Sequence, residues 1–152
     1  MRKISISADR SYEVLLDIDY LTTLESAAIG RERVAIIHSE AMTGRITHLR
    51  DTEAQVFFFP IPDGEAGKSA DTLLKVWDWL GAAGFTRSDL IVGIGGGAVT
   101  DFAGFAAATW LRGLDWIAVP TTVAGMVDAA IGGKTGINSE YGKNLIGSFN
   151  SP

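Results

Sequence analysis

The sequence predicts an α/β fold, with a mostly parallel sheet and helices on both of its faces. Two observations lead to this prediction. Short apolar runs of strand length alternate along the chain with longer segments whose apolar residues recur at helical spacing. In the middle of the chain, the apolar run 90–94 is followed by three glycines and then by 98–111, which is rich in small residues and helix formers. Strands that alternate with helices pair in parallel through right-handed crossovers.

Composition limits the classes of protein that this chain can belong to. A length of 152 residues suits one domain, and 47% hydrophobic against 20% charged residues is typical of a globular chain. A net charge of −5 argues against a nucleic-acid partner. No cysteine is present, and neither His38 nor His48 has a metal-ligand partner at a recognisable spacing, so no metal ligands are expected. Without a signal peptide or a segment long enough to span a membrane, we expect a cytoplasmic protein and no membrane partner.

The first half of the chain contains most of the expected strands. In order, the expected elements are strands at 3–8 and 12–18, a helix at 20–28, a strand at 33–37, a helix at 40–50 and a strand at 55–61. The turn-like Ser-Ala-Asp-Arg-Ser between the first two strands suits a hairpin. Gly30 is expected to end the helix at 20–28.

The second half contains the unit around which the chain is organised. A polar loop at 63–68 precedes a helix at 69–83, and a strand is expected at 116–119 after the central unit. In the helix at 98–111, small residues fall at helical spacing, so we expect this smooth face to lie close on the sheet. The residues of that face are Gly104, Ala107, Ala108 and Leu111.

Ligands in such sheets bind beyond the carboxyl ends of the strands. Four such ends are expected, after Ile37, Ile61 and Ile94 and at Thr121-Thr122. The glycines after Ile94 let a ligand approach the backbone, and free N–H groups at the start of a helix favour an anion.

The glycine turn alone is a weak signal for a cofactor. The pattern Gly93-x-Gly95-x-x-Ala98 loosely fits a dinucleotide-binding fingerprint, and Asp115 lies roughly where the acid that holds the ribose would be. A glycine-rich turn without a ligand is the alternative, and Asp115 is better interpreted as the polar start of the strand at 116–119.

The segment 129–149 is glycine-rich and polar, with no clear helical or strand period. It contains charged and amide side chains that could hold a polyhydroxylated anion in a glycine-rich cleft. These are Asp128, Lys134, Lys143 and Asn144, together with Arg112 at the end of the central helix. Solvated surface charge is the alternative for each lysine.

Several longer motifs occur together in a fixed order. They are Gly95-Gly-Gly-Ala-Val-Thr-Asp101, Ala108-Thr-Trp-Leu-Arg-Gly113, Pro120-Thr-Thr122, Met126-Val-Asp-Ala-Ala-Ile-Gly-Gly-Lys-Thr-Gly-Ile-Asn138 and Gly142-Lys-Asn-Leu-Ile-Gly-Ser-Phe149. In these motifs the sequence resembles the 3-dehydroquinate synthase family. The matching positions are dense from Asp63 onward, and the motif sequences are most similar to those of the actinobacterial members.

The resemblance implies a Rossmann-like fold and an enzyme of the shikimate pathway. The family converts 3-deoxy-arabino-heptulosonate 7-phosphate into 3-dehydroquinate and phosphate, using NAD and a divalent metal, zinc or cobalt. A ring hydroxyl is transiently oxidised because the resulting ketone acidifies the neighbouring C–H, which permits phosphate elimination; the hydride then returns and an aldol step closes the ring. The family's metal ligands lie in a C-terminal helical domain. Residues 1–152 are therefore expected to be the N-terminal NAD-binding domain, a fragment of a longer two-domain enzyme that forms a homodimer.

The resemblance also assigns site residues. The positions that match NAD-binding residues are Asp63, Glu65, Lys68, Gly96, Gly97, Ala98, Asp101, Thr121, Thr122, Lys134 and Lys143. The positions that match substrate-binding and catalytic residues are Arg112, Asp128, Lys134, Lys143 and Asn144.

The chain departs from the family pattern after its second core strand. Many members carry Thr-Asp-x-Asn there to hold the adenosine ribose, whereas this chain has His38-Ser39-Glu40-Ala41. Another sugar-phosphate cyclase and a non-catalytic nucleotide-binding module are the alternatives for the function. A metal-dependent alcohol dehydrogenase is disfavoured by Gly-Lys-Asn-Leu-Ile-Gly at 142–147.

Overall fold

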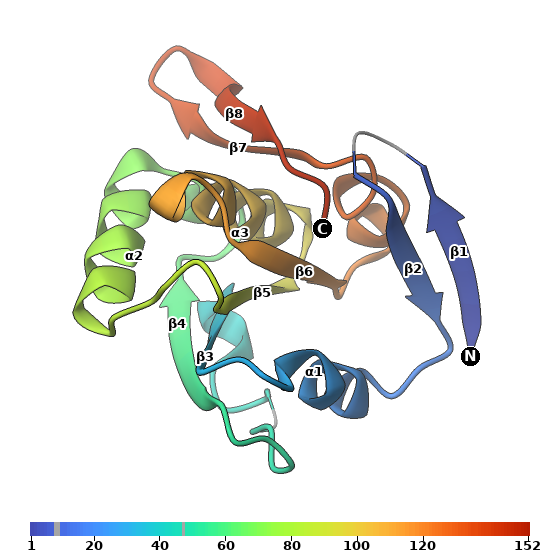
Figure 1. Ribbon diagram of the computed structural model, residues 1–152. Helices are drawn as coiled ribbons and strands as arrows, with labels where there is room; N and C mark the ends of the chain where they lie inside the picture. Colours follow the sequence, from blue (N-terminus) through green and yellow to red (C-terminus); the bar gives the residue numbers. More distant parts are fainter. Residues whose placement is uncertain (8–9, 47) are drawn as a thin grey trace.

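A four-stranded parallel sheet forms the centre of the molecule. The computed structural model describes residues 1–7, 10–46 and 48–152. The strands lie side by side in the order β4 (Gln55–Ile61), β3 (Arg33–Ser39), β5 (Leu90–Gly95) and β6 (Asp115–Pro120), and each neighbouring pair is parallel. Figure 1 shows β5, which leads into the glycine turn, beside β6. This arrangement confirms the predicted α/β, Rossmann-like fold with a parallel sheet.

Helices cover both faces of this sheet, as the sequence predicts. α2 (Ala70–Ala82) and α3 (Gly97–Thr109) pack on one face, and α1 (Tyr20–Ala28) packs on the other. Side chains alternate along β5, so Ile91 faces α2 and α3 whereas Val92 faces α1. None of the helices in the described part of the chain is long and apolar enough to cross a membrane.

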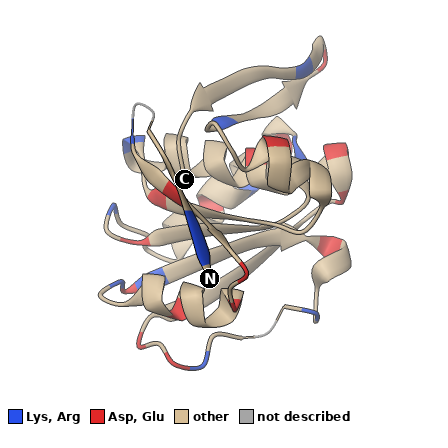
Figure 2. Ribbon diagram, turned by 90° about the vertical axis from the view of Figure 1, so that its right-hand side faces the viewer, with Lys and Arg blue, Asp and Glu red and all other residues tan. Residues whose placement is uncertain are grey.

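Charges of both signs are mixed over the surface. Figure 2 shows Lys and Arg interspersed with Asp and Glu along the ribbon, without one continuous basic stripe on the elements that it colours. Exposed ion pairs account for part of this mixing, such as Arg2 with Asp17 and Lys3 with Glu13. Water screens such pairs, so they contribute little to stability.

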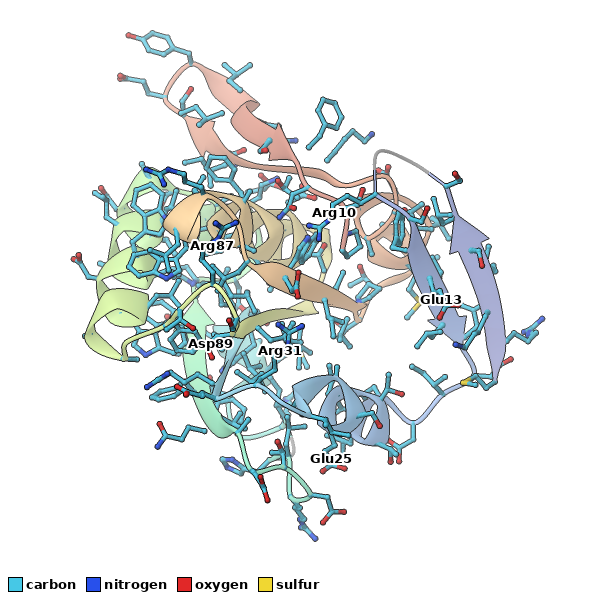
Figure 3. All side chains as sticks on the ribbon, in the orientation of Figure 1. Arg10, Glu13, Glu25, Arg31, Arg87 and Asp89 are labelled. Carbon is cyan, nitrogen blue, oxygen red and sulfur yellow. The ribbon has the colours of Figure 1, made fainter. Side chains whose placement is uncertain are left out.

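A polar network closes the edge of the sheet at which the strands begin. The buried Asp89 carboxylate accepts hydrogen bonds from the backbone N–H groups of Arg33 at 2.9 Å and Thr86 at 2.7 Å. Arg31 donates to the Asp115 carboxylate at 2.7 Å. Figure 3 shows Arg31 and Asp89 at this edge. Asp115 therefore begins β6, as expected, and lies at the edge opposite the glycine turn, which excludes it as the ribose-binding acid.

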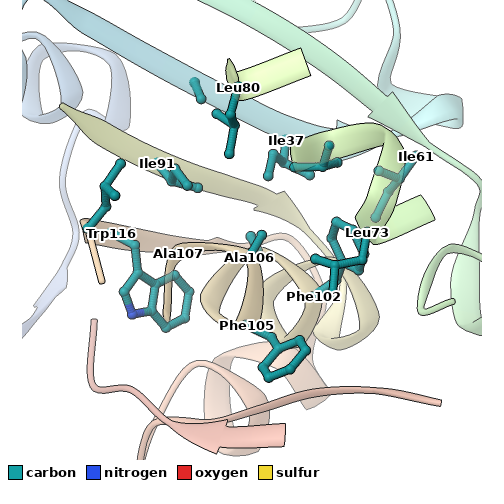
Figure 4. Packing of buried hydrophobic residues seen from close by; sticks show 14 of the residues in the cluster. Ile37, Ile61, Leu73, Leu80, Ile91, Phe102, Phe105, Ala106, Ala107 and Trp116 are labelled. Carbon is teal, nitrogen blue, oxygen red and sulfur yellow. The ribbon is translucent and has the colours of Figure 1, made fainter. Parts of the chain in front are cut away.

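The contact between α3 and β5 leaves no room for a larger side chain. An ideal Cβ on Gly93 would lie 2.6 Å from the Cβ atom of Ala103. Figure 4 shows Ala106 and Ala107 on the side of α3 that faces Ile91 in the same core. Because this contact is so close, the start of α3 is held directly beyond the carboxyl end of β5.

The predicted sheet-facing stripe of α3 is only partly right. Gly104 faces Trp116 of the edge strand, where an ideal Cβ would be 2.7 Å from the Cζ2 atom, and it also faces Thr135 of β7. Leu111 lies beyond the end of α3, is 43% exposed and has φ 49°. The helix is buried by the sheet on one side and by a hairpin on another, so its small residues do not define a single face.

That hairpin was not predicted from the sequence. β7 (Lys134–Ser139) and β8 (Gly142–Phe149) pair antiparallel and lie across α3 (Figure 1). β8 is exposed along nearly its whole length, so its sequence shows no apolar alternation. Gly136 and Gly147 face each other across the ladder and further weaken the strand pattern.

The predicted hairpin near the N-terminus is confirmed. β1 (Arg2–Ile6) and β2 (Tyr12–Leu16) pair antiparallel, although residue 8, the predicted end of the first strand, lies outside the described residues. The Tyr12 hydroxyl accepts a hydrogen bond from the backbone N–H of Gly132 at 2.9 Å, which ties this hairpin to the segment before β7.

The predicted helix at 40–50 is wrong. Residue 47 lies outside the described residues, and among residues 40–46 and 48–50 helical structure is limited to a short 3₁₀ turn at Glu40–Met42, for which Ser39 provides no side-chain cap. Gly44 has φ 75°, a left-handed conformation that ends helical geometry. Ile46 nevertheless packs on the α1 face of the sheet, which explains the apolar residues that suggested a helix. The other predicted helices and strands are confirmed, with ends that differ by a few residues.

We expect Gly93→Ala to lower the free energy of unfolding by about 1–3 kcal/mol, the usual cost of an extra methyl group in a filled core. The new methyl would meet Ala103, so the double variant Gly93→Ala/Ala103→Gly should recover part of the loss by moving one methyl group across the contact. Urea unfolding of both variants tests this. A single variant as stable as wild type would show that α3 does not lie this close to β5.

Candidate functional site

Four loops meet beyond the carboxyl ends of the parallel strands. Because the strands are parallel and in register, Ser39 of β3 lies beside Ile61 of β4, and Gly95 of β5 lies beside Pro120 of β6. The loops that follow these residues contain most of the predicted site residues. The predicted convergence of these loops at one edge of the sheet is therefore confirmed, and ligand binding there stays a prediction.

The glycine turn leaves the start of α3 open. Gly96 is the N-cap of the 13-residue helix and provides no side-chain cap, so the first N–H groups of Gly97 and Ala98 are available to an anion. The Thr121 N–H donates to the Gly95 carbonyl oxygen at 2.8 Å. An ideal Cβ on Gly96 would lie 3.4 Å from the Cγ2 atom of Thr122. The structure thus brings the predicted cofactor residues of the turn together with the two threonines.

The polar loop after β4 supplies three further predicted residues. Asp63 accepts a hydrogen bond from the Ala41 N–H at 3.1 Å, so it caps the turn after β3. The loop then forms a short 3₁₀ turn, η2 (Gly64–Gly67), that carries Glu65. Glu65 accepts a hydrogen bond from the side-chain amide of Asn138 at 2.6 Å.

Lys68 ends this loop and is the most deeply buried charged side chain of the site. Its side chain is 1% exposed, and its ammonium donates to the Asp101 carboxylate at 2.7 Å and to the Asn144 side-chain oxygen. Burial raises the pKa of Asp101, and the Lys68 ammonium opposes that rise. Three segments that are distant in sequence, the loop, α3 and β8, therefore meet at one ammonium group.

A cavity of about 460 Å³ opens next to this cluster. It is lined by α3, the segment before β7 and the β7–β8 hairpin, and its polar lining includes Asp101, Asp128, Lys134 and Asn144. The Lys134 ammonium lies 3.9 Å from the Asp128 carboxylate, and both side chains are more than 70% exposed, at 72% and 79%. These two groups are free to exchange their contact for one with a ligand.

Two of the five predicted substrate-binding and catalytic residues, Arg112 and Lys143, are not among the residues that line this cavity. Arg112 lies beyond the far end of α3, whereas Asp101 lies near its start, and the eight residues from Asp101 to Thr109 alone span roughly 12 Å at 1.5 Å per residue. Its grouping with the other charged residues in one cleft is therefore incorrect within this chain. Lys143 is exposed, and its charge acts on Glu65 instead, where it helps to lower the pKa of that carboxyl.

The sequence analysis missed the role of Asn138. Its side chain contacts Glu65 and its side-chain oxygen accepts the backbone N–H of Asn144 at 2.9 Å. The hydrogen bond from Asn138 is the largest cause of the lowered pKa of Glu65. The only signal in the sequence was its place at the end of the long motif 126–138, which does not distinguish it from its neighbours.

The residues of this edge do not assemble a metal centre. Within residues 1–7, 10–46 and 48–152, no three His, Asp or Glu side chains are grouped so that they could hold a metal ion. His38 is buried at the end of β3, with its Nδ1 atom 2.9 Å from the carbonyl oxygen of Ser39. The site can thus offer an anion-binding helix start, an amide and paired charges.

Comparison with known proteins agrees with this geometry. Residues 58–152 match the family model described as 3-dehydroquinate synthase N-terminal, which is more than half of the chain. The chain belongs to the 3-dehydroquinate synthase family. The 3-dehydroquinate synthase of Streptomyces coelicolor is 54% identical over 147 residues, which cover 93% of this chain and 40% of that relative. The chain thus spans well under half the length of the curated family members that it matches.

Solved structures of related cyclases share the fold. A structure of 2-deoxy-scyllo-inosose synthase complexed with carbaglucose-6-phosphate, NAD+ and Co2+ has a TM-score of 0.88 and 26% identity, over 99% of this chain and 44% of that one. ValA, a 2-epi-5-epi-valiolone synthase from Streptomyces hygroscopicus with NAD+ and Zn2+ bound, has a TM-score of 0.74 and 27% identity, over 97% and 43%. The 3-dehydroquinate synthase family thus shares its N-terminal architecture with these other cyclases.

We expect Asp101→Asn to lower the free energy of unfolding by about 3 kcal/mol, because it leaves a buried ammonium without its carboxylate. Lys68→Met should cost less, since the Asp101 side chain is 20% exposed and can take up a proton. Burial raises the pKa of Asp101 in the folded protein, so this carboxyl favours folding most when it is protonated, at a pH below its ordinary pKa. The cost of Lys68→Met should therefore shrink as the pH falls. Urea unfolding at several pH values measures both losses. Small and equal losses would contradict a buried, structural ion pair.

Proposed function

We propose that this chain is the N-terminal NAD-binding domain of a longer two-domain 3-dehydroquinate synthase. In this proposal the whole enzyme converts 3-deoxy-arabino-heptulosonate 7-phosphate into 3-dehydroquinate and phosphate. The observation that carries the proposal is the contact of Lys68 with both Asp101 and Asn144. It joins residues that match the family's cofactor positions to a residue that matches its substrate positions, at one edge of the sheet.

The residues at the glycine turn fit a dinucleotide. The diphosphate of NAD would accept hydrogen bonds from the open N–H groups of Gly97 and Ala98, with Thr121 and Thr122 beside it. Bound NAD supplies a temporary hydride acceptor for a ring hydroxyl of the substrate. Glu65 and Lys68 would hold the cofactor on the side of the cavity.

The cavity residues fit the substrate. Lys134 offers a point charge for an anionic group, Asp128 accepts hydrogen bonds from hydroxyl groups, and Asn144 offers an amide. Asp101 with Lys68, and Asp128 with Lys134, are each electrically balanced pairs. A phosphate and a carboxylate need more positive charge than these pairs leave over, which supports a site completed by further residues of a longer protein. Within this chain, Lys143 and Arg112, neither of which lines the cavity, remain the further candidates for contact with the substrate.

The surroundings of the cavity also support a site that another part of a longer protein completes. Leu145 and Phe149, which line it, are 63% and 81% exposed, and Val123 and Val127 on the segment that leads to Asp128 are 75% and 71% exposed. Such a patch is typical of a surface that another part of a protein covers. We propose that a C-terminal domain covers it and supplies the ligands for zinc or cobalt, because the residues described here include no metal centre.

The nearest alternative is a different sugar-phosphate cyclase. The related cyclase structures share 26% and 27% identity with this chain, against 54% for a 3-dehydroquinate synthase, which favours the latter. The family resemblance further supports a cytoplasmic homodimer that acts on a small-molecule substrate. Neither nucleic acid nor a membrane is part of the proposal, in keeping with the net charge of −5.

We expect Gly96→Ala to weaken NAD binding by roughly tenfold or more, because its methyl group would enter the space between the helix start and Thr122. The fold should tolerate it, since its Cβ would lie 3.4 Å from Thr122, an ordinary contact. Gly81→Ala in α2, where the Cβ would lie 3.3 Å from Trp110, is the matched control and should leave NAD affinity unchanged. Calorimetric titration measures both. Equal affinities would place the diphosphate elsewhere.

We expect Lys134→Ala to lower kcat/KM of the longer protein by roughly two to three orders of magnitude, as for loss of one charged donor in a site. Lys75→Ala on the exposed side of α2 is the matched control and should have almost no effect. Release of phosphate and formation of 3-dehydroquinate from the sugar acid phosphate are measured together. If the wild-type protein forms neither product, the proposed enzymatic function is refuted and a non-catalytic nucleotide-binding module is favoured. A Lys134→Ala variant within about threefold of wild type would show that this lysine is only surface charge.

A further inference from the structure

Asn138 makes three hydrogen bonds to three predicted site residues. Its backbone N–H donates to the Lys68 carbonyl oxygen at 2.8 Å. Its side-chain nitrogen donates to the Glu65 carboxylate at 2.6 Å, and its side-chain oxygen accepts the Asn144 backbone N–H at 2.9 Å. One residue thus connects the polar loop after β4 with the bulged part of β8.

The local backbone explains how Asn138 can make these contacts. The β7–β8 ladder is irregular here, since Ile137 pairs with Ile146 and Ser139 pairs with Gly142. One residue of β7 therefore faces a longer stretch of β8 that includes Asn144, which has φ 56°. Such a bulge redirects side chains and frees backbone groups from the ladder. The N–H of Asn138 is consequently available to Lys68 instead of β8.

We propose that Asn138 is a positioning residue, which holds Asn144 and the Glu65–Lys68 loop in the arrangement that forms the Lys68–Asp101–Asn144 cluster. The relevance of this role to catalysis depends on the function proposed above. The geometric role itself does not, because it concerns contacts within this chain.

An amide is the side chain that suits this position. The Glu65 carboxylate only accepts hydrogen bonds when it is ionised, and the Asn144 N–H only donates. A single amide group satisfies both, with its nitrogen on one side and its oxygen on the other. Glu65 also faces two cations, Lys68 and Lys143, which together with this hydrogen bond lower its pKa and keep it ionised.

The first test compares two asparagine-to-alanine variants of the 152-residue chain. Asn138→Ala removes the contacts at the site end of the hairpin. Asn150→Ala removes a hydrogen bond of 3.0 Å to the Gly104 carbonyl oxygen, which anchors the other end of the hairpin to α3. Hydrogen exchange of the Asn144 backbone amide, followed by NMR, is the readout.

We expect Asn138→Ala to speed exchange of the Asn144 amide by roughly tenfold, the effect of losing one net hydrogen bond. Asn150→Ala should leave that exchange rate near the wild-type value. Unchanged exchange in Asn138→Ala, or equal acceleration in both variants, would overturn the proposal. NAD affinity is measured in parallel and should fall only in Asn138→Ala. If the wild-type chain binds no NAD, the proposed function is refuted for this chain, while the exchange rates still decide the role of Asn138.

The second test exchanges the donor and the acceptor across the 2.6 Å contact. Asn138→Asp retains an acceptor for Asn144 but sets two carboxylates against each other, so exchange should be fast near neutral pH and slow again at about pH 5, where the pair shares a proton. The double variant Asn138→Asp/Glu65→Gln restores an amide opposite a carboxylate and should be protected at both pH values, each rate being compared with wild type at the same pH. Glu65→Gln alone completes the cycle. A double variant as unprotected as Asn138→Asp would show that the pairing of these two side chains does not position Asn144.

Discussion

The buried ammonium of Lys68 constrains the rest of the site. A charged group without access to water needs a carboxylate and further hydrogen bonds, since an unpaired buried charge is costly. Asp101 provides the carboxylate from the N-terminal half of α3, and Asn144 provides an oxygen from β8. If the loop after β4, the central helix or the hairpin moved independently, the Lys68 ammonium would be exposed to water or left buried without a partner. Polar contacts of this kind help to hold β8, which buries little apolar surface, whereas β7 also packs Ile137 into the core.

The parts of the fold that could be predicted are those set by burial. Strands buried on both faces read as continuous apolar runs, and the run before the glycines is such a strand, with all six residues of β5 buried. Once the strands were taken as parallel, the convergence of their carboxyl ends followed from geometry alone. The positions of the glycine turn, of Thr121 and Thr122 and of the polar loop could thus be predicted without any contact being known.

The parts that could not be predicted are set by contacts between residues distant in sequence. The β7–β8 hairpin is specified by bonds such as those from Asn138 to Glu65 and Lys68, about seventy positions earlier, and no local pattern encodes them. The error at 40–50 has a different origin, since apolar residues that pack on the α1 face do so from an irregular segment. The grouping of Arg112 with the cavity residues relied on charge alone. The length of the helix between it and Asp101 already implied a separation of several turns.

Two ion pairs of the site have the same residue types, a lysine and an aspartate, but differ in burial. The Lys68 ammonium is buried 2.7 Å from the Asp101 carboxylate, so separating the two would leave a buried charge without its counter-ion. Lys134 and Asp128 lie 3.9 Å apart and are mostly exposed, so water already solvates both and little is lost when they part. A ligand can therefore replace the contact between Lys134 and Asp128 at low cost, whereas the contact between Lys68 and Asp101 stays in place when a ligand binds. A lysine and an aspartate thus form a fixed structural ion pair in one place and an exchangeable surface contact in the other. The burial of the lysine by its surroundings determines which of the two roles the pair has.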